Sequence, residues 1–254
     1  MNRFLLLAIF CVIAFLSFAQ EKEFDLNAPL PFDPKIKKGM LENGLTYYIR
    51  ENHQPEKRAE LRLVVNAGSL QETGNQLGLA HFAEHMCFNG TKTFAKNDLI
   101  NFLEQMGIKF GPELNAYTSF EETVYMLYIP TDKPGLLDTG IMVLEDWAHN
   151  VTFDYEEIDK ERGVIVEEWR LHLGANERMM QQYIPIVLKD SRYAERLPIG
   201  KMDIVENCPY DTLIQFYKDW YRPNLMAVVV VGDVNVDDVE QKIKNHFGNY
   251  KNPK

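Results

Sequence analysis

Residues 81–91 read HFAEHMCFNGT, and this stretch fixes the centre of the expected fold. His81 and His85 are four residues apart, so on a helix they project from one face about one turn apart. The residues around them are mostly apolar: Phe82, Ala83, Met86, Cys87 and Phe88. Ionisable groups on a buried helix need polar partners or a metal ion. The stretch therefore predicts a largely buried helix, within residues 77–88, that carries functional histidines.

The same helix contains the residue types of a zinc hydrolase. Zinc accepts imidazole nitrogens as ligands, and one helical face can deliver two. Glu84 follows His81 by three residues on the same side, where a carboxylate can take a proton from water that zinc has acidified. Two surface histidines and a solvated glutamate would give the same His-x-x-Glu-His pattern. The apolar flanks favour the metal site.

A catalytic zinc ion takes three protein ligands and keeps one position open. The best source of the third ligand is residues 161–169, ERGVIVEEW. Glu161 and Glu168 lie seven residues apart there, which is two helical turns, so both face one way. Taken alone, Glu168 fits a solvated surface residue better than a ligand. Glu168 is the candidate for the third ligand because it lies on the same helical face as Glu161 and that face is partly apolar.

The apolar pattern along the chain predicts the remaining elements. Strands are expected at residues 44–50, 59–66, 116–129 and 226–231. Helices are expected at residues 77–88, 97–106, 136–150, 154–173, 176–188, 210–220 and 236–247. Strands alternating with helices in this way favour an α+β fold, with one mainly antiparallel sheet and helices packed on one face.

The N-terminus predicts export. Arg3 precedes residues 4–18, an unbroken run of apolar or small residues that ends near Ala19. This pattern is typical of a signal peptide at residues 1–19, with an uncleaved anchor as the alternative. We expect an extracytoplasmic, periplasmic product without stable membrane insertion after cleavage. Residues 20–40 form a polar lead-in, residues 41–250 the folded domain, and residues 251–254 the start of a linker.

Charge and cysteine content narrow the class of protein. The 254 residues carry a formal net charge of -10, which repels a phosphate backbone and argues against nucleic acid as a partner. Only Cys87 and Cys208 follow the predicted signal peptide, and two cysteines are no disulfide framework. They could pair in an oxidising compartment, but two buried thiols are favoured.

Three stretches, in this order, resemble the pitrilysin/insulinase zinc peptidases: HFAEHMCFNGT, GIKFGPELNAYTSFEETVYMLYIP and KERGVIVEEWR. The resemblance covers residues 40–250 and is closest to bacterial periplasmic-type members. It implies an N-terminal catalytic domain with the fold of pitrilysin and the mitochondrial processing peptidase.

The resemblance also implies roles for individual residues. Zn²⁺ would be held by His81, His85 and Glu168. Glu84 would be the general base, and Glu161 would support the site without binding the metal. The gap between the histidines and Glu168 is somewhat longer than in many relatives, so Glu167 is a rival ligand. The phase with Glu161 favours Glu168.

The NAYT segment matches the family's stretch beside the cleft. The resemblance implies that Asn115, Ala116, Tyr117 and Thr118 bind peptide substrate as a strand added to the sheet edge. From the residues alone, this segment is an ordinary loop-to-strand junction. Family members usually combine several homologous domains around a chamber, whereas this chain has only the first. A homologous C-terminal half or partner subunit is therefore expected, because a closed chamber positions substrate and excludes water.

Three functions remain open at this stage. The first is a zinc endopeptidase acting on peptides or unfolded segments. The second is a non-catalytic docking or core subunit, against which the intact His81, Glu84 and His85 argue. The third is a metal-binding module without hydrolysis, in which Glu84 would have no use as a base.

Overall fold

The computed structural model describes residue 28 and residues 31–96, 98–109, 111 and 113–253. The predicted signal peptide, residues 1–19, lies outside the described residues, as do residues 20–27, 29 and 30 of the lead-in. Met1–Asp33 and Pro34–Lys254 are separate units, and the elements below all belong to the second.

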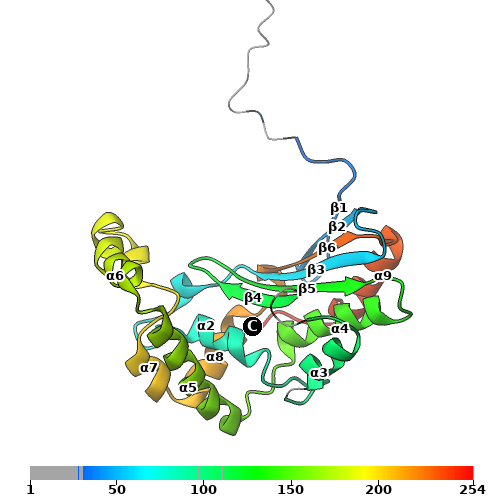
Figure 1. Ribbon diagram of the computed structural model, residues 1–254. Coiled ribbons are helices and arrows are strands. Elements are labelled where there is room, and N and C mark those ends of the chain that lie inside the picture. The colour runs from blue at the N-terminus through cyan, green and yellow to red at the C-terminus, as the bar shows by residue number, and fades with distance from the viewer. Residues whose placement is uncertain (1–27, 29–30, 97, 110, 112, 254) are drawn as a thin grey trace, which may run out of the picture. The chain divides into compact units, whose positions relative to one another are not determined.

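A six-stranded sheet forms the frame of this unit within the described residues, in the order β1-β2-β6-β3-β5-β4 (Figure 1). Strands β2 and β6 pair in parallel and all other neighbours pair antiparallel, which confirms the mainly antiparallel sheet. The strands are β1 (Lys37–Met40), β2 (Thr46–Glu51), β3 (Arg58–Val65), β4 (Leu114–Thr118), β5 (Thr123–Pro130) and β6 (Met226–Gly232).

Alternation along the strands gives the sheet one apolar face. In β3, every second residue from Ala59 to Val65 is buried, and β6 shows the same period. Successive side chains of a strand point to opposite faces, so the buried set lies on one side. The partly exposed Glu60 and Arg62 form an ion pair on the other side of β3.

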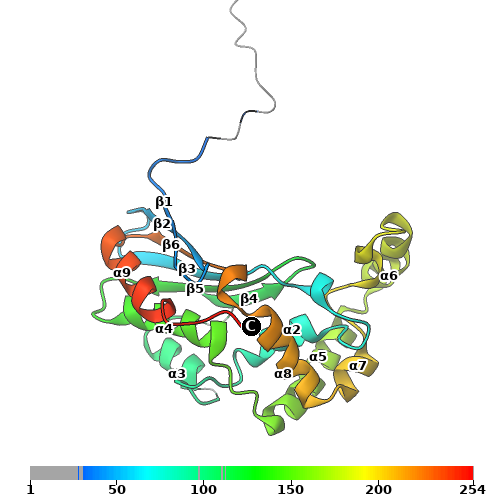
Figure 2. The same ribbon diagram turned by 180° about the vertical axis from the view of Figure 1, so that it is seen from behind.

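The helices cover that apolar face, as Figures 1 and 2 show for α2, α4 and α9. This arrangement confirms the α+β prediction. The helices are α2 (Leu79–Met86), α3 (Asp98–Gln105), α4 (Leu136–His149), α5 (Tyr155–His172), α6 (Ala175–Val187), α7 (Met202–Asn207), α8 (Tyr210–Trp220) and α9 (Val236–Phe247). The described residues also form short 3-10 turns: η1 (Ser69–Gln71), η2 (Arg192–Glu195) and η3 (Pro223–Leu225).

The single strand expected at residues 116–129 was wrong, because the structure has two strands there. A turn at residues 119–122 separates β4 from β5 and is closed by a 2.7 Å hydrogen bond from Ser119 N to Glu122 O. Phe120 places an apolar residue inside the turn, so the pattern of apolar residues did not show that the strand is interrupted there. The six-residue α7 was also missed, since it is too short to display a helical period. The last four residues of the predicted lead-in form β1.

Both described cysteines are buried free thiols, as favoured from the sequence. The Cys87 Sγ donates to the Tyr125 hydroxyl at 3.2 Å, and the Cys208 Sγ accepts from Arg162 Nη1 at 3.2 Å. Burial is the main reason that the pKa of Cys87 is raised well above its usual range. Among the described residues, each helix is too short or too polar to cross a membrane.

Candidate functional site

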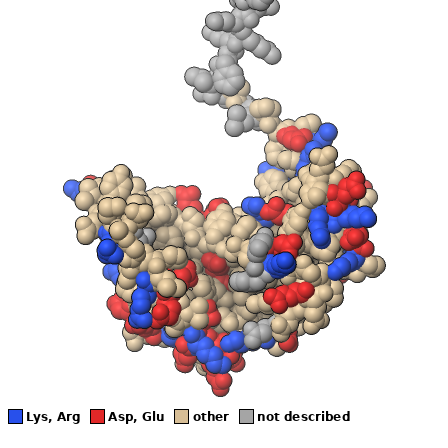
Figure 3. Space-filling model, in the orientation of Figure 1, with Lys and Arg blue, Asp and Glu red and all other residues tan. Residues whose placement is uncertain are grey.

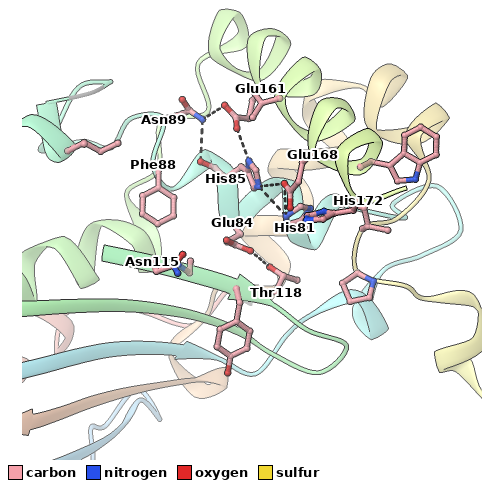
Figure 4. Close-up of a pocket in the computed structure, with 17 residues that line it drawn as sticks. His81, Glu84, His85, Phe88, Asn89, Asn115, Thr118, Glu161, Glu168 and His172 are labelled. Carbon is pink, nitrogen blue, oxygen red and sulfur yellow. Dashed lines mark hydrogen bonds and ion pairs between the residues drawn. The ribbon is translucent and has the colours of Figure 1, made fainter. Parts of the chain in front are cut away.

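Helix α2 carries both histidines into a pocket of about 700 Å³. Residues of α2, β4 and α5 line it, together with Pro198 and Ile199 (Figure 4). Figure 3 shows this side of the molecule as a hollow between α6 and the sheet, with acidic and basic side chains interspersed around it.

Three side chains from two helices converge in the pocket. The Nε2 atoms of His81 and His85 are 3.1 Å apart, and the Glu168 Oε2 lies 3.6 and 3.3 Å from them, respectively. The three donor atoms all lie within 4.8 Å of one another. Ligands of a tetrahedral zinc ion, each about 2.0–2.1 Å from the metal, lie about 3.3 Å apart. The geometry of this cluster therefore fits zinc.

The charge balance of the cluster also favours a cation. Burial, followed by the charge of His85, lowers the pKa of His81 to about 4, so this ring is neutral. The hydrogen bond with His85 keeps the pKa of Glu168 below its usual range. Burial lowers the pKa of His85, but hydrogen bonds with Glu161 and Glu168 outweigh it and raise the pKa to about 9. At neutral pH His85 therefore carries a proton on the side of Glu168, and a metal ion bound to its Nε2 would replace that proton as the positive charge of the cluster.

The long helix α5 delivers the two glutamates. Its N-cap is Asp154, whose Oδ1 accepts from Glu156 N at 2.9 Å. Ile158 and Ile165 are its buried residues, and they share their phase with Glu161 and Glu168. The burial of this apolar pair turns the two carboxylates toward α2.

Glu167 lies outside the cluster. Its carboxylate pairs with Arg170 at 2.5 Å, and both side chains are largely exposed. The helix therefore presents Glu168 to the histidines and Glu167 to solvent.

Glu161 contacts a histidine on the side away from the cluster. Its Oε1 lies 2.7 Å from His85 Nδ1, so the ring is oriented with Nε2 toward Glu168. Asn89 donates to the other oxygen, Glu161 Oε2, at 2.7 Å (Figure 4). Asn89 was not among the candidates from sequence, although its position four residues after His85 on the same face could have shown it. His172, four residues after Glu168, also lines the pocket and was likewise missed.

Glu84 lies beside the cluster and is 7% exposed. Its Oε2 accepts a 2.6 Å hydrogen bond from the Thr118 hydroxyl. Burial raises the pKa of Glu84, which makes its carboxylate a stronger base than an exposed one.

The four candidate substrate-binding residues all contribute to the pocket lining. They belong to β4, and no other strand pairs with the outer side of β4 in the described part of the chain. Alternation divides the four side chains: Ala116 and Thr118 are half-buried, whereas Asn115 and Tyr117 are exposed. The Tyr117 hydroxyl donates to Glu122 at 2.8 Å.

The start of α2 depends on a buried carboxylate. Glu72 Oε1 accepts from the backbone N of Gly78 at 3.0 Å and of Ala80 at 2.9 Å. We expect Glu72→Ala to lower the free energy of unfolding of the zinc-free chain by about 2–4 kcal/mol, because two buried N–H groups lose their acceptor. Urea unfolding measures this. Glu72→Gln keeps an acceptor and should lose much less, and equal losses in the two variants would contradict the capping role.

Glu72 also predicts a pH dependence. Burial, opposed by the backbone donors, raises its pKa from 4.5 in the unfolded chain to about 8 in the folded one. The folded state therefore binds the proton more tightly, and stability is lost as pH rises from about 4.5 to about 8. In urea titrations, the free energy of unfolding of the wild-type chain should fall over this pH range relative to that of Glu72→Gln. Parallel pH profiles for the two proteins would contradict the raised pKa of Glu72.

Comparison with known proteins identifies the family. The model for insulinase (peptidase family M16) matches residues 47–192, and that for the peptidase M16 inactive domain matches residues 207–254. The probable zinc protease PqqL of Haemophilus influenzae is 41% identical over 94% of this chain and 26% of its own length. The Escherichia coli protein of the same name is 44% identical over 87% of this chain and 24% of its own length.

A solved structure agrees with these matches. The first half of the periplasmic protease PqqL from Escherichia coli superposes with a TM-score of 0.85 at 43% identity, covering 89% of this chain and 48% of that one. The chain thus spans about a quarter of the length of the curated relatives. The resemblance inferred from the three motifs is confirmed. With a family model matching more than half of its residues, the chain belongs to the insulinase family of zinc proteases, peptidase family M16.

Proposed function

We propose that this chain is the zinc-binding catalytic domain of a metalloendopeptidase that hydrolyses peptides or unfolded segments. His81, His85 and Glu168 hold the zinc ion, and Glu84 is the general base. The observation that carries the proposal is the convergence of three ligand atoms within 4.8 Å next to a buried carboxylate in an open pocket.

Each residue has a distinct task in hydrolysis. When bound, zinc supplies Lewis-acid chemistry, which polarises a carbonyl and acidifies water. Glu84 takes the proton from the attacking water and delivers it to the leaving amine. Glu161 keeps the His85 ring in one orientation through the 2.7 Å hydrogen bond to Nδ1.

The free edge of β4 supports binding of an extended peptide. A strand added there would be held by backbone hydrogen bonds, which any sequence can make, while side-chain contacts provide selection. The backbone of Asn115, Ala116 and Tyr117 is the proposed binding edge, and it runs alongside the pocket that contains Glu84.

Full activity is proposed to need a homologous second half and to occur outside the cytoplasm. The relatives are about four times longer than this chain, and the similar Escherichia coli protein is described as periplasmic. The apolar run at residues 4–18 supports the same compartment. We expect the single domain to bind zinc and to cleave slowly, because its pocket is open on one side.

A peptidase assay tests the proposal. Residues 20–254, loaded with zinc, should cleave an unstructured quenched-fluorescence peptide, lose the activity to a chelator and regain it with added zinc. Trace proteases are controlled by a parallel preparation of Glu84→Gln. If a folded, zinc-loaded chain stays inactive even when a homologous C-terminal half is supplied, the endopeptidase proposal fails and a metal-binding module becomes the better reading.

A further inference from the structure

We infer that Thr118 is a positioning residue that fixes the general base through a hydrogen bond, an inference that rests on the proposed function of Glu84. The Thr118 hydroxyl donates to Glu84 Oε2 at 2.6 Å, a distance typical of a charge-assisted O–H···O⁻ bond. This role differs from the one expected for Thr118 from the family segment, which was contact with substrate.

The hydroxyl has one proton and two nearby acceptors. Thr123 Oγ1 lies 3.4 Å from Thr118 Oγ1, whereas the Glu84 carboxylate is nearer and carries charge. Thr123 is itself buried and donates its proton to Ala67 O at 3.0 Å. Since each hydroxyl has a single proton, Thr118 is the donor to Glu84, and the 3.4 Å approach to Thr123 is a packing contact.

This hydrogen bond gives the two carboxylate oxygens of Glu84 different roles. Oε2 is occupied by Thr118, and Oε1 accepts no hydrogen bond from any residue that the structure describes. Glu84 lines the pocket, so Oε1 is the oxygen available to water. A fixed Oε2 restricts rotation of the carboxylate and thereby aims Oε1, which is the condition for efficient proton transfer.

The backbone around Thr118 is held firmly enough for this task. Thr118 pairs with Thr123 at the end of β4, directly before the turn. Residues of η1 fix that turn, with Ser69 N donating to Ser119 O at 3.1 Å and Leu70 N to Phe120 O at 2.9 Å. At Gly68, a Cβ would lie 2.2 Å from Ser119 O, so the close approach of the two segments requires glycine.

Thr118→Val tests the inference, because valine has nearly the same shape and is a good strand former but lacks the hydroxyl. We expect kcat to fall about 10- to 100-fold with KM changed by less than about twofold. Thr118→Ser should restore kcat to within about threefold of wild type, since serine returns the donor. Zinc content should be the same in all three proteins.

A matched control separates the hydroxyl from the substitution itself. Thr46→Val makes the same change in β2, which three other strands separate from β4 in the sheet, and should leave kcat and KM unchanged. A rise in KM without a change in kcat for Thr118→Val would show that Thr118 contacts substrate and would overturn the positioning role. Unchanged kinetics for Thr118→Val would overturn it as well.

A second readout does not depend on activity. In crystals of the zinc-free proteins, the Glu84 carboxylate should keep its place in wild type and Thr118→Ser and adopt a second orientation in Thr118→Val. A single unchanged orientation in Thr118→Val would refute the inference. If the zinc-loaded wild type does not cleave peptide, the proposed function fails, and these crystals still decide whether Thr118 positions Glu84.

Discussion

Glu84→Gln is expected to reduce kcat about 10²- to 10⁴-fold while zinc binding is retained, which is the usual contribution of a general base. Glutamine has the same size, and its amide oxygen can still accept the 2.6 Å hydrogen bond from Thr118. The amide cannot take a proton from water. The variant therefore removes the proton acceptor and leaves the cluster of His81, His85 and Glu168 intact.

Steady-state kinetics and metal analysis of the same preparation measure the two expected results, the fall in kcat and the retention of zinc. Glu60→Gln is the matched control, because Glu60 is partly exposed, pairs with Arg62 on the open face of the sheet and should not affect cleavage. Activity that persists in Glu84→Gln, with zinc present and contaminating proteases removed, would rule out Glu84 as the base. Loss of zinc together with activity would instead show that Glu84 supports the metal site.

Glu168→Ala and Glu167→Ala are expected to differ sharply in zinc affinity, although they are adjacent glutamates on one helix. Loss of a residue that merely supports a metal ligand typically costs 10–100-fold in affinity, so loss of a ligand should cost at least about 100-fold. Glu168 Oε2 lies 3.3 and 3.6 Å from the two histidine nitrogens. Glu167 pairs with Arg170 toward solvent, so its removal should leave affinity within about twofold.

Competition with a chromophoric chelator gives both dissociation constants. Each variant serves as the other's control for the effect of alanine on helix α5. Weakened zinc binding in Glu167→Ala together with normal zinc binding in Glu168→Ala would reverse the assignment and make Glu167 the ligand. Equal losses would indicate that the substitutions act on the helix rather than on the metal.

Both helices of the site could be predicted from the sequence, because the functional residues of each are spaced so that they share one helical face. The spacing of His81 and His85 predicts a shared face of α2, and the seven-residue spacing of Glu161 and Glu168 predicts a shared face of α5. Local patterns of this kind survive folding because buried apolar residues fix which face turns inward. The expected helix at residues 154–173 accordingly differs from the observed Tyr155–His172 by one residue at each end.

Contacts between distant segments were much harder to predict. The hydrogen bond from Thr118 to Glu84 depends on a turn at residues 119–122 that the apolar pattern concealed, and on the approach of η1 to that turn. The donation from Asn89 to Glu161 joins residues 72 positions apart. Periodicity indicates which face is buried, but it does not give the distance between one element and the next. Such contacts follow from packing of the whole sheet and its helices.

The central claim is that His81, His85 and Glu168 form one zinc site. The most direct test is an anomalous difference map, recorded at the zinc absorption edge from crystals of the zinc-loaded chain. We predict one peak in the pocket, about 2.0–2.2 Å from His81 Nε2, His85 Nε2 and a carboxylate oxygen of Glu168. A peak bound to other residues, or none in a folded chain soaked with zinc, would contradict the account.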